Sequence, residues 1–157
     1  MIKSLIITII LSMLPISELR GSIPYAILEA GINPFTAFLI AVLANILIIP
    51  LFFFFLDYVH KSFIKIKIYE RFFKFYIDKK VKKIKKKYEQ LELFVLFFFV
   101  AIPAPGTGAY TGVLLSWFFE LDRKKGFATI ALGVITSGII TTLITLGCLG
   151  IFRVFLN

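Results

Sequence analysis

The sequence is poor in the residues on which most soluble catalytic and metal sites depend. Its 157 residues include one cysteine, one histidine and one tryptophan. Because Cys148 is the single cysteine, a disulfide within the chain is excluded. The sequence carries no metal-ligand spacing, no phosphate-binding loop and no nucleophile beside a base. We therefore expect no metal, no cofactor and no enzyme activity.

Hydrophobic residues are present well above the usual share. They make up 59% of the chain, with 19 phenylalanines, and the mean hydropathy is +0.94. An ordinary soluble domain has roughly 45–50% apolar residues. So few polar side chains cannot cover a chain of this length in water, which excludes a soluble globular enzyme and a disordered protein. We therefore predict an integral membrane protein of the all-α class.

The net charge of +9 is concentrated in one stretch of the sequence. Residues 57–92 hold 12 basic and 5 acidic residues, a net +7, and the other 121 residues carry only +2. No module that reads nucleic acid surrounds these lysines, so we expect no nucleic-acid partner. Cytoplasmic loops of membrane proteins carry an excess of lysine and arginine. We interpret residues 57–92 as a basic cytoplasmic insert between two apolar halves.

The insert mixes its lysines with isoleucine and phenylalanine. This pattern predicts an amphipathic segment lying on the cytoplasmic leaflet, with a solvated connector as the alternative. The densest lysine cluster would favour anionic lipid headgroups, and it consists of Lys79, Lys80, Lys82, Lys83, Lys85, Lys86 and Lys87.

Two apolar stretches are long enough to span a bilayer, which takes about 20 residues. They are residues 34–56 and 127–156. The first contains one central polar residue, Asn45, for which we favour a hydrogen bond between helices over a substrate role. The second carries small residues at four-residue spacing, and we interpret this stripe as a helix-packing face: Gly133, Ser137 and Thr141.

Two further apolar segments, residues 1–30 and 93–119, are interrupted by proline and glycine. Each begins with a ten-residue apolar run, which as a helix covers about 15 Å, half of a bilayer core. Two short helices around such a break are typical of a re-entrant hairpin, which enters the membrane and returns to the same side. A signal peptide is the alternative for the N-terminal run, but no small-residue cleavage site follows it.

The two halves of the chain therefore resemble each other. Residues 1–56 and residues 93–157 each combine a re-entrant hairpin with one transmembrane helix. A second basic cluster follows this hairpin and consists of Arg123, Lys124 and Lys125. It lies on the same side of the membrane as the basic insert only if residues 93–119 enter the membrane and return to that side. This topology makes the two repeats inverted, with their breaks meeting near the midplane. We expect a multi-pass protein of the cytoplasmic membrane and, because two spans enclose little volume, a homo-oligomer.

The first break contains the main candidates for chemistry, Glu18 and Arg20. An ionisable residue at membrane depth costs ~2.5–3.5 kcal/mol and usually faces a cavity or a partner. Arg20 could hold a phosphate by a bidentate contact. Glu18 could neutralise Arg20, bind a cation or carry a proton. The alternative is that both lie in an ordinary loop at the water interface. Gly21 and Pro24 complete this candidate substrate site.

The second break is rich in glycine and hydroxyl groups. Its glycines allow the backbone to come close to a ligand, and the amides that begin the next short helix would attract an anion. The alternative is a tight turn that only packs against the other hairpin. The candidate substrate-binding residues here are Pro103, Pro105, Gly106, Thr107, Gly108, Tyr110 and Thr111.

Three motifs together resemble a known family. LPISELRGSIPYAI (residues 14–27), AIPAPGTGAYTGVLLSWFF (residues 101–119) and ALGVITSGII (residues 131–140) are similar to the prokaryotic small multidrug export proteins. The proline-glycine break also resembles that of the distant DedA superfamily, although Thr107 stands where those proteins have an acidic residue. DedA members have paired re-entrant hairpins and move lipid-linked phosphates or phospholipids. The resemblance therefore implies a membrane transporter.

These observations predict transport or flipping through a midplane cavity between the two hairpins. A substrate with a lipid phosphate would be drawn by Arg20 and the glycine-rich helix start. Two alternatives stay open. The first is a multidrug exporter that draws amphipathic cations to Glu18. The second is a membrane scaffold in which the breaks only pack and nothing is transported.

Overall fold

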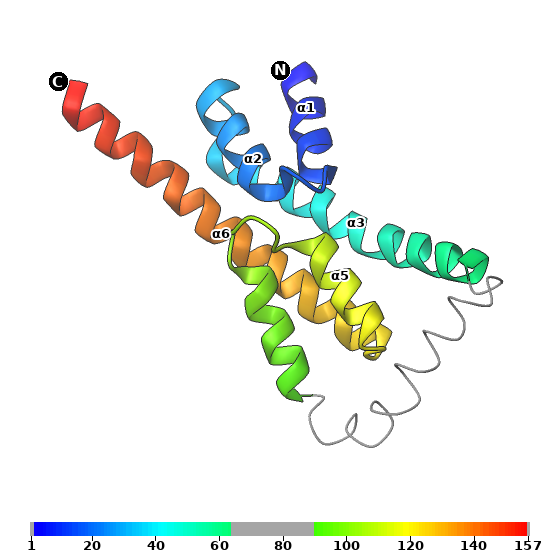
Figure 1. The fold of residues 1–157 in the computed structure, drawn as a ribbon. Helices are drawn as coiled ribbons and strands as arrows, with labels where there is room; N and C mark the ends of the chain where they lie inside the picture. The colour runs from blue at the N-terminus through cyan, green and yellow to red at the C-terminus, as the bar shows by residue number, and fades with distance from the viewer. Residues whose placement is uncertain (1, 64–89, 157) are drawn as a thin grey trace.

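The computed structural model describes residues 2–63 and 90–156, and this part of the chain is helical without strands. The predicted all-α class is therefore confirmed for the described residues. The insert's expected amphipathic segment and lysine cluster lie outside them. The elements, shown in Figure 1, are α1 (Ile2–Met13), α2 (Glu18–Pro24), η1 (Tyr25–Glu29, a π-helical turn), α3 (Pro34–Phe63), the Gln90–Ala101 helix, α5 (Ala109–Phe118) and α6 (Arg123–Leu156).

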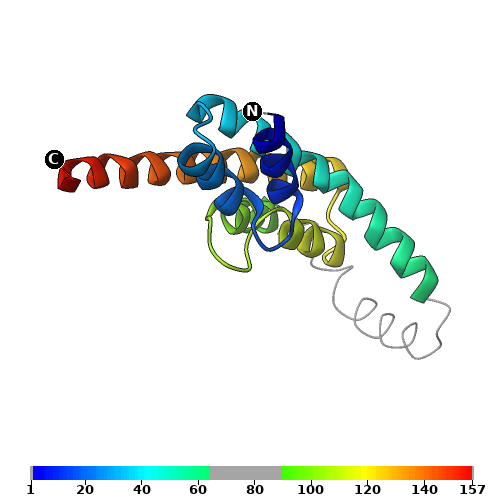
Figure 2. The same ribbon diagram turned by 90° about the horizontal axis from the view of Figure 1, so that it is seen from above.

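Two long helices, α3 and α6, contact each other at the centre of the molecule. From above, their C-terminal ends leave the centre in opposite directions (Figure 2). Pro34–Val59 and Arg123–Leu149 are long and apolar enough to cross a membrane, with mean hydropathies of 2.8 and 2.0. The expected pair of spanning segments is thus present by length and composition.

The helix boundaries differ from those expected at two places. Helix α3 begins at Pro34 as predicted but continues past Leu56 to Phe63. Helix α6 begins at Arg123 rather than at Phe127. The Asp122 carboxylate explains this early start, because its Oδ1 accepts hydrogen bonds from the backbone N–H groups of Lys124 and Lys125 at 3.0 and 2.9 Å. Asp122 is therefore the N-cap of α6.

Small residues bring the helices close together. A Cβ atom at Gly133 would lie 2.7 Å from Cβ of Val100, and one at Gly138 would lie 2.7 Å from Cγ2 of Val42. Ser137 and Thr141, which share the predicted stripe with Gly133, are buried, so this stripe of α6 is a packing face as predicted. The fully buried Asn45 donates from Nδ2 to the carbonyl of Ser12 at 2.7 Å. This bond joins α3 to α1 and confirms the predicted role of Asn45.

The first break is shorter than the sequence indicates. The proline and glycine residues of the sequence mark a break from Pro15 to Pro24, but α2 already begins at Glu18, so Glu18 and Arg20 are helical residues. Helix α2 ends at Pro24, which has no N–H to continue the i→i−4 ladder, and the chain continues as the π-helical turn η1. The turn between α1 and α2 is confined to residues 14–17.

The second break falls where the sequence places it, between Ala101 and Ala109. The Gln90–Ala101 helix leads into it and α5 leads out of it. Leu91 and Glu92, at the start of this segment, border the same groove as Phe119 and Leu121, which follow α5. The two ends of the segment therefore lie together, so residues 90–121 form a helical hairpin.

Candidate functional site

The tips of the two hairpins contact each other. The buried Glu18 accepts a hydrogen bond at Oε2 from the backbone N–H of Ala109, 3.3 Å away. The Tyr110 hydroxyl donates to the backbone carbonyl of Met13. We call this contact between residues 13–20 and 108–110 the crossing. The two breaks, which the sequence predicts to meet, lie against each other there.

Glu18 lies at the N-terminus of α5, whose unpaired amides carry partial positive charge. Gly108 precedes that helix with φ +125°, a conformation that favours glycine. A Cβ atom at Gly108 would overlap the Glu18 carboxylate. Glycine is therefore required here for close approach. In this structure Glu18, rather than a ligand, supplies the negative charge that the sequence predicts at this helix start.

Arg20 follows Glu18 in α2 and is only partly satisfied. Its Nη2 donates to the carbonyl of Ile16 at 2.6 Å. Its Nη1 is buried and has no hydrogen-bond partner among the described residues. A buried donor without an acceptor carries a desolvation penalty of about 1–3 kcal/mol, and more when it is charged. The Arg20 guanidinium therefore keeps one unused hydrogen-bond donor, which has almost no exposed surface in this structure.

The backbone of Glu18 is in the left-handed region, with φ +43°. A residue with a Cβ atom rarely adopts this conformation, and it costs of order 1–3 kcal/mol where it persists. The contact with α5 holds Glu18 in place despite this cost. Such strain, at a buried charge between two broken helices, is typical of functional positions.

The other predicted residues of the first break have mainly structural contacts. A Cβ atom at Gly21 would lie 2.7 Å from Cβ of Ser17, so glycine allows the start of α2 to pack closely. Pro24 ends α2 and leads into η1. Neither residue is within the group of contacts that defines the crossing.

Thr107 of the second break uses its hydroxyl within its own turn. Its Oγ1 donates toward the carbonyls of Ile102 and Ala104, at 2.7 and 2.8 Å, and accepts from the N–H of Ala104 at 3.1 Å. Gly106, with φ +84°, lies exposed in the same turn. Of the second-break candidates, Gly108 and Tyr110 are brought to the crossing. Pro103 and Pro105 belong to the turn, and Thr111 is half-buried in α5.

A second cluster, at the opposite end of α5, lies outside the candidate sites predicted from the sequence. Asp57 of α3 accepts at Oδ1 from Nε1 of Trp117 at 2.9 Å and forms an ion pair with Arg123 at 2.5 Å. The Arg123 guanidinium also lies 4.7 Å from the centre of the Phe53 ring. Asp57 had been counted only as the first residue of the basic insert. The sequence signal that could have identified Asp57 is its position, an acidic residue directly after an apolar span.

A comparison with known families identifies the family of this chain. Residues 18–140 match the family described as "putative small multi-drug export protein". This chain belongs to the small multi-drug export family. The matched region begins at Glu18, contains Ala109 and Tyr110 and extends through most of the second spanning helix. No curated protein and no solved structure matches the chain.

The family description, taken with the two apolar helices, identifies a membrane protein of a transporter family. It does not specify which molecules are exported. The similarity to DedA proteins stays a prediction. Among residues 2–59 and 90–149 of this small multi-drug export protein, the crossing is the one place where a buried charged side chain joins the two broken segments.

Proposed function

We propose that the protein transports an amphipathic molecule with a lipid-phosphate-like headgroup across the cytoplasmic membrane, through the crossing. The observation that carries the proposal is the contact between Glu18 and the N-terminus of α5, beside the partly satisfied Arg20. Transporters with interrupted helices in corresponding positions bind their substrates at such helix ends.

The charges at the crossing favour an anionic headgroup. The start of α5 is partly positive, and Arg20 adds a full positive charge. The single negative charge of Glu18 neutralises only one of these two positive charges. A phosphate can accept from backbone amides and from a guanidinium in the same site. In our proposal the phosphate replaces Glu18 at α5 and bonds to Arg20, and Glu18 returns once the substrate leaves.

The proposal requires both hairpins to be re-entrant and to enter from opposite sides. Asp57 and Arg123 pair with each other, so the end of α3 and the start of α6 lie together. The insert that follows α3 and the basic residues 123–125 would then share the cytoplasmic side, as the positive-inside rule favours. A broken backbone at membrane depth must be buried in protein or line a cavity, and the crossing offers such a place.

Two expectations about partners belong to the same proposal. The lysine cluster of residues 79–87 would bind anionic lipid headgroups on the cytoplasmic leaflet.

A second copy of the chain would help enclose the path, because two spanning helices surround little volume. Light scattering of the protein in nanodiscs would give the number of copies.

The test is lipid translocation in proteoliposomes. Fluorescent phosphatidic acid, which has a phosphate monoester headgroup, would be compared with fluorescent phosphatidylcholine, using an impermeant quencher added outside. We expect the protein to accelerate the translocation of phosphatidic acid and to leave the translocation rate of phosphatidylcholine unchanged. Arg20→Gln should slow it at least tenfold, and Arg20→Lys should have an intermediate effect because the charge stays but the bidentate geometry is lost.

Lys3→Gln is the matched control, since Lys3 is an exposed basic residue of the same hairpin. It should leave the rate unchanged. Equal rates for the two lipids, or an Arg20→Gln variant as fast as the unaltered protein, would refute the proposal.

A cation exporter is the second candidate, because Glu18 is the only buried acidic side chain among the described residues. For that function Glu18→Gln would abolish export of an amphipathic cation, while Arg20→Gln would retain it. A scaffold that only packs would tolerate Glu18→Gln and Arg20→Lys with its assembly intact. The same set of variants therefore separates all three functions.

A further inference from the structure

The last two carbonyl groups of α1 are bonded to side chains from distant segments. The Ser12 carbonyl accepts from Nδ2 of Asn45 at 2.7 Å, and the Met13 carbonyl accepts from the Tyr110 hydroxyl. Within the described part of the chain, no backbone N–H is bonded to either carbonyl. Both belong to the partly negative end of the helix. Because a carbonyl oxygen has two lone pairs, each can still bind a positive group.

Asn45 adds a third oxygen to this end of α1. Its side chain is fully buried, and its Oδ1 has no hydrogen-bond partner among residues 2–63 and 90–149. Oδ1 and Nδ2 belong to the same carboxamide, so Oδ1 lies close to the Ser12 carbonyl that Nδ2 contacts. A buried acceptor without a partner is costly. This oxygen therefore gains from a donor or a cation beside it.

We propose that Asn45 and the C-terminus of α1 form a binding site for a sodium ion. Its ligands would be Oδ1 of Asn45 and the backbone carbonyls of Ser12 and Met13. Transporters with broken helices bind Na⁺ or H⁺ at such helix C-termini. The sequence does not predict this site, because two of the three ligands are backbone oxygens.

The ligand types favour a monovalent ion. Protein sites for Ca²⁺ and Mg²⁺ are built with carboxylates. Among the described residues, no three histidine, cysteine or acidic side chains lie together in a group that could hold a metal. The three oxygens proposed here are neutral, and neutral oxygens balance the charge of a monovalent ion more easily than that of a divalent one.

The charges of the crossing supply a reason for a cation at this place, and for that role the inference rests on the proposed transport. Glu18 is bonded to the N-terminus of α5, and Arg20 is the positive side chain beside it. A phosphate that replaces Glu18 at α5 adds negative charge and leaves the carboxylate without its donor. A sodium ion at Met13, which belongs to the crossing, would neutralise one of these negative charges.

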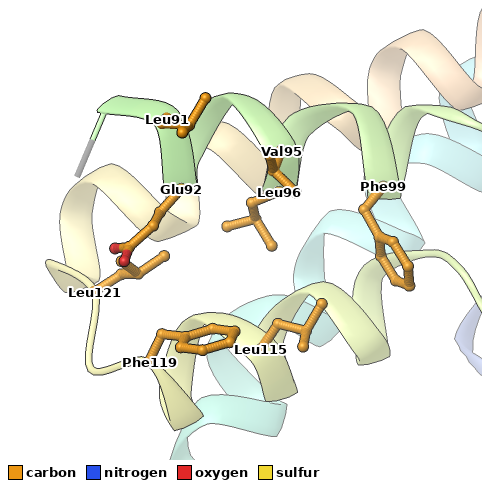
Figure 3. Close-up of a pocket in the computed structure, with 8 residues that line it drawn as sticks. All are labelled: Leu91, Glu92, Val95, Leu96, Phe99, Leu115, Phe119 and Leu121. Carbon is orange, nitrogen blue, oxygen red and sulfur yellow. The ribbon is translucent and has the colours of Figure 1, made fainter. Parts of the chain in front are cut away.

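The groove between the Gln90–Ala101 helix and α5 offers an ion no such ligands. Its volume is about 250 Å³, and the surface it exposes is entirely apolar. In Figure 3, leucine and phenylalanine side chains from the two helices face each other across it. An ion would lose its hydration there without compensation. The end of α1 is therefore the better place for a cation, and the groove is not.

Binding of radioactive sodium to the full-length protein in phosphatidylcholine nanodiscs would test the site. No phosphate-monoester lipid is needed, so the result does not depend on the transport assay. We expect saturable binding by the unaltered protein. Asn45→Ala removes Oδ1 and should weaken the binding by about tenfold or more.

A second variant guards against a loss of folding, because Asn45→Ala also removes the bond to Ser12. Asn45→Asp keeps an oxygen and adds a negative charge, so it should bind sodium at least as tightly as the unaltered protein. Its melting temperature should rise when sodium chloride replaces N-methylglucamine chloride at equal ionic strength, because a ligand that binds the folded state stabilises it.

Two further variants serve as controls. Ser116→Ala removes a hydroxyl that is also buried and without a partner among the described residues, but that lies toward the other end of α5. It should leave sodium binding unchanged. Arg20→Gln, which tests transport of the phosphate lipid, removes a positive charge and should not weaken sodium binding. The failure of one proposal is therefore distinguishable from the failure of the other.

Three results would overturn the inference. The first is an unaltered protein without saturable sodium binding. The second is an Asn45→Ala variant that binds sodium as tightly as the unaltered protein, or an equal loss in Ser116→Ala. The third is a melting temperature that is the same in both salts for the unaltered protein and for Asn45→Asp, which would assign Oδ1 of Asn45 to a bound water molecule.

Discussion

The Glu18 carboxylate accepts a hydrogen bond from the backbone N–H of Ala109, although 91 positions separate the two residues in the sequence. One side chain therefore joins the two broken segments of the chain. It also supplies the negative charge at the start of α5, where a ligand's anion would otherwise be expected. Four predictions test this arrangement and the contacts around it.

Removing the Glu18 side chain should destabilise the protein. Glu18→Ala leaves the first amides of α5 without their acceptor, and the loss of such a cap costs about 0.5–2 kcal/mol. Glu18→Gln keeps an oxygen acceptor and should cost less. Thermal unfolding in detergent, followed by circular dichroism, would measure both variants. A Glu18→Ala variant that melts at the temperature of the unaltered protein would show that the carboxylate does not cap α5.

Gly108 should tolerate no side chain. Gly108→Ala places a Cβ atom onto the Glu18 carboxylate and forces a strained φ of +125°. Since backbone strain alone costs of order 1–3 kcal/mol, we expect a loss of at least that size. Gly147→Ala is the control, because a Cβ atom there would meet nothing within 4 Å.

The double variant Gly108→Ala/Glu18→Ala separates the two causes of that loss. It should recover the part due to overlap with Glu18 and keep the part due to the backbone, so the two single effects should not add. The melting temperatures of the single and double variants give the coupling. Additive effects would mean that the two residues are not in contact.

Asp57 should hold the ends of α3, α5 and α6 together. Asp57→Ala removes both the bond to Trp117 and the ion pair with Arg123. Asp57→Asn removes the charge but retains an oxygen for Trp117. The two charged side chains are 50% and 39% exposed, so the ion pair alone should contribute only about 0–1 kcal/mol.

Trp117 is the only tryptophan, so its fluorescence reports on this cluster directly. We expect the emission maximum to shift in Asp57→Ala and to stay near its original value in Asp57→Asn. A matching shift in both variants would show that an uncharged oxygen at position 57 is not sufficient to bind Trp117. Arg123→Lys, which keeps the charge, serves as the control for the ion pair.

Cysteine labelling in whole cells would test the re-entrant topology. On a Cys148→Ser background, single cysteines at Asn33 and Lys124 would be probed with a membrane-impermeant thiol reagent. The proposal expects Asn33 to be labelled from outside and Lys124 only after permeabilisation. A further cysteine at Lys83 should behave like the one at Lys124. If Lys83 and Lys124 are labelled from opposite sides, residues 93–119 are an ordinary span and the inverted repeat is wrong.

The membrane class and the all-helical architecture could be predicted because they depend on composition. The high apolar content excludes a water-soluble fold whatever the chain topology. The start of α3 at Pro34 was also readable, because Asn33 followed by proline is a local signal for a helix N-terminus. The role of Asn45 followed from the cost of a polar group among apolar helices, which favours a bond to another helix.

Local signals misplaced the start of α2. Prolines and a glycine between residues 15 and 24 indicate a long break, yet only residues 14–17 form the turn. Glu18 begins the helix with an unfavourable φ because its side chain is bonded to α5. The contact with a distant segment thus outweighs the local preference, and no window of sequence contains both partners.

The sequence by itself determined that this protein is an all-helical membrane protein, that two of its helices can span and that its basic residues gather in one insert. Each of these follows from hydropathy, charge and helix signals, which act over short stretches of chain. Only the tertiary structure decided that Glu18 meets Ala109 and that Asp57 meets Trp117 and Arg123. These pairs depend on how helices pack, because packing brings residues together regardless of their separation in the sequence.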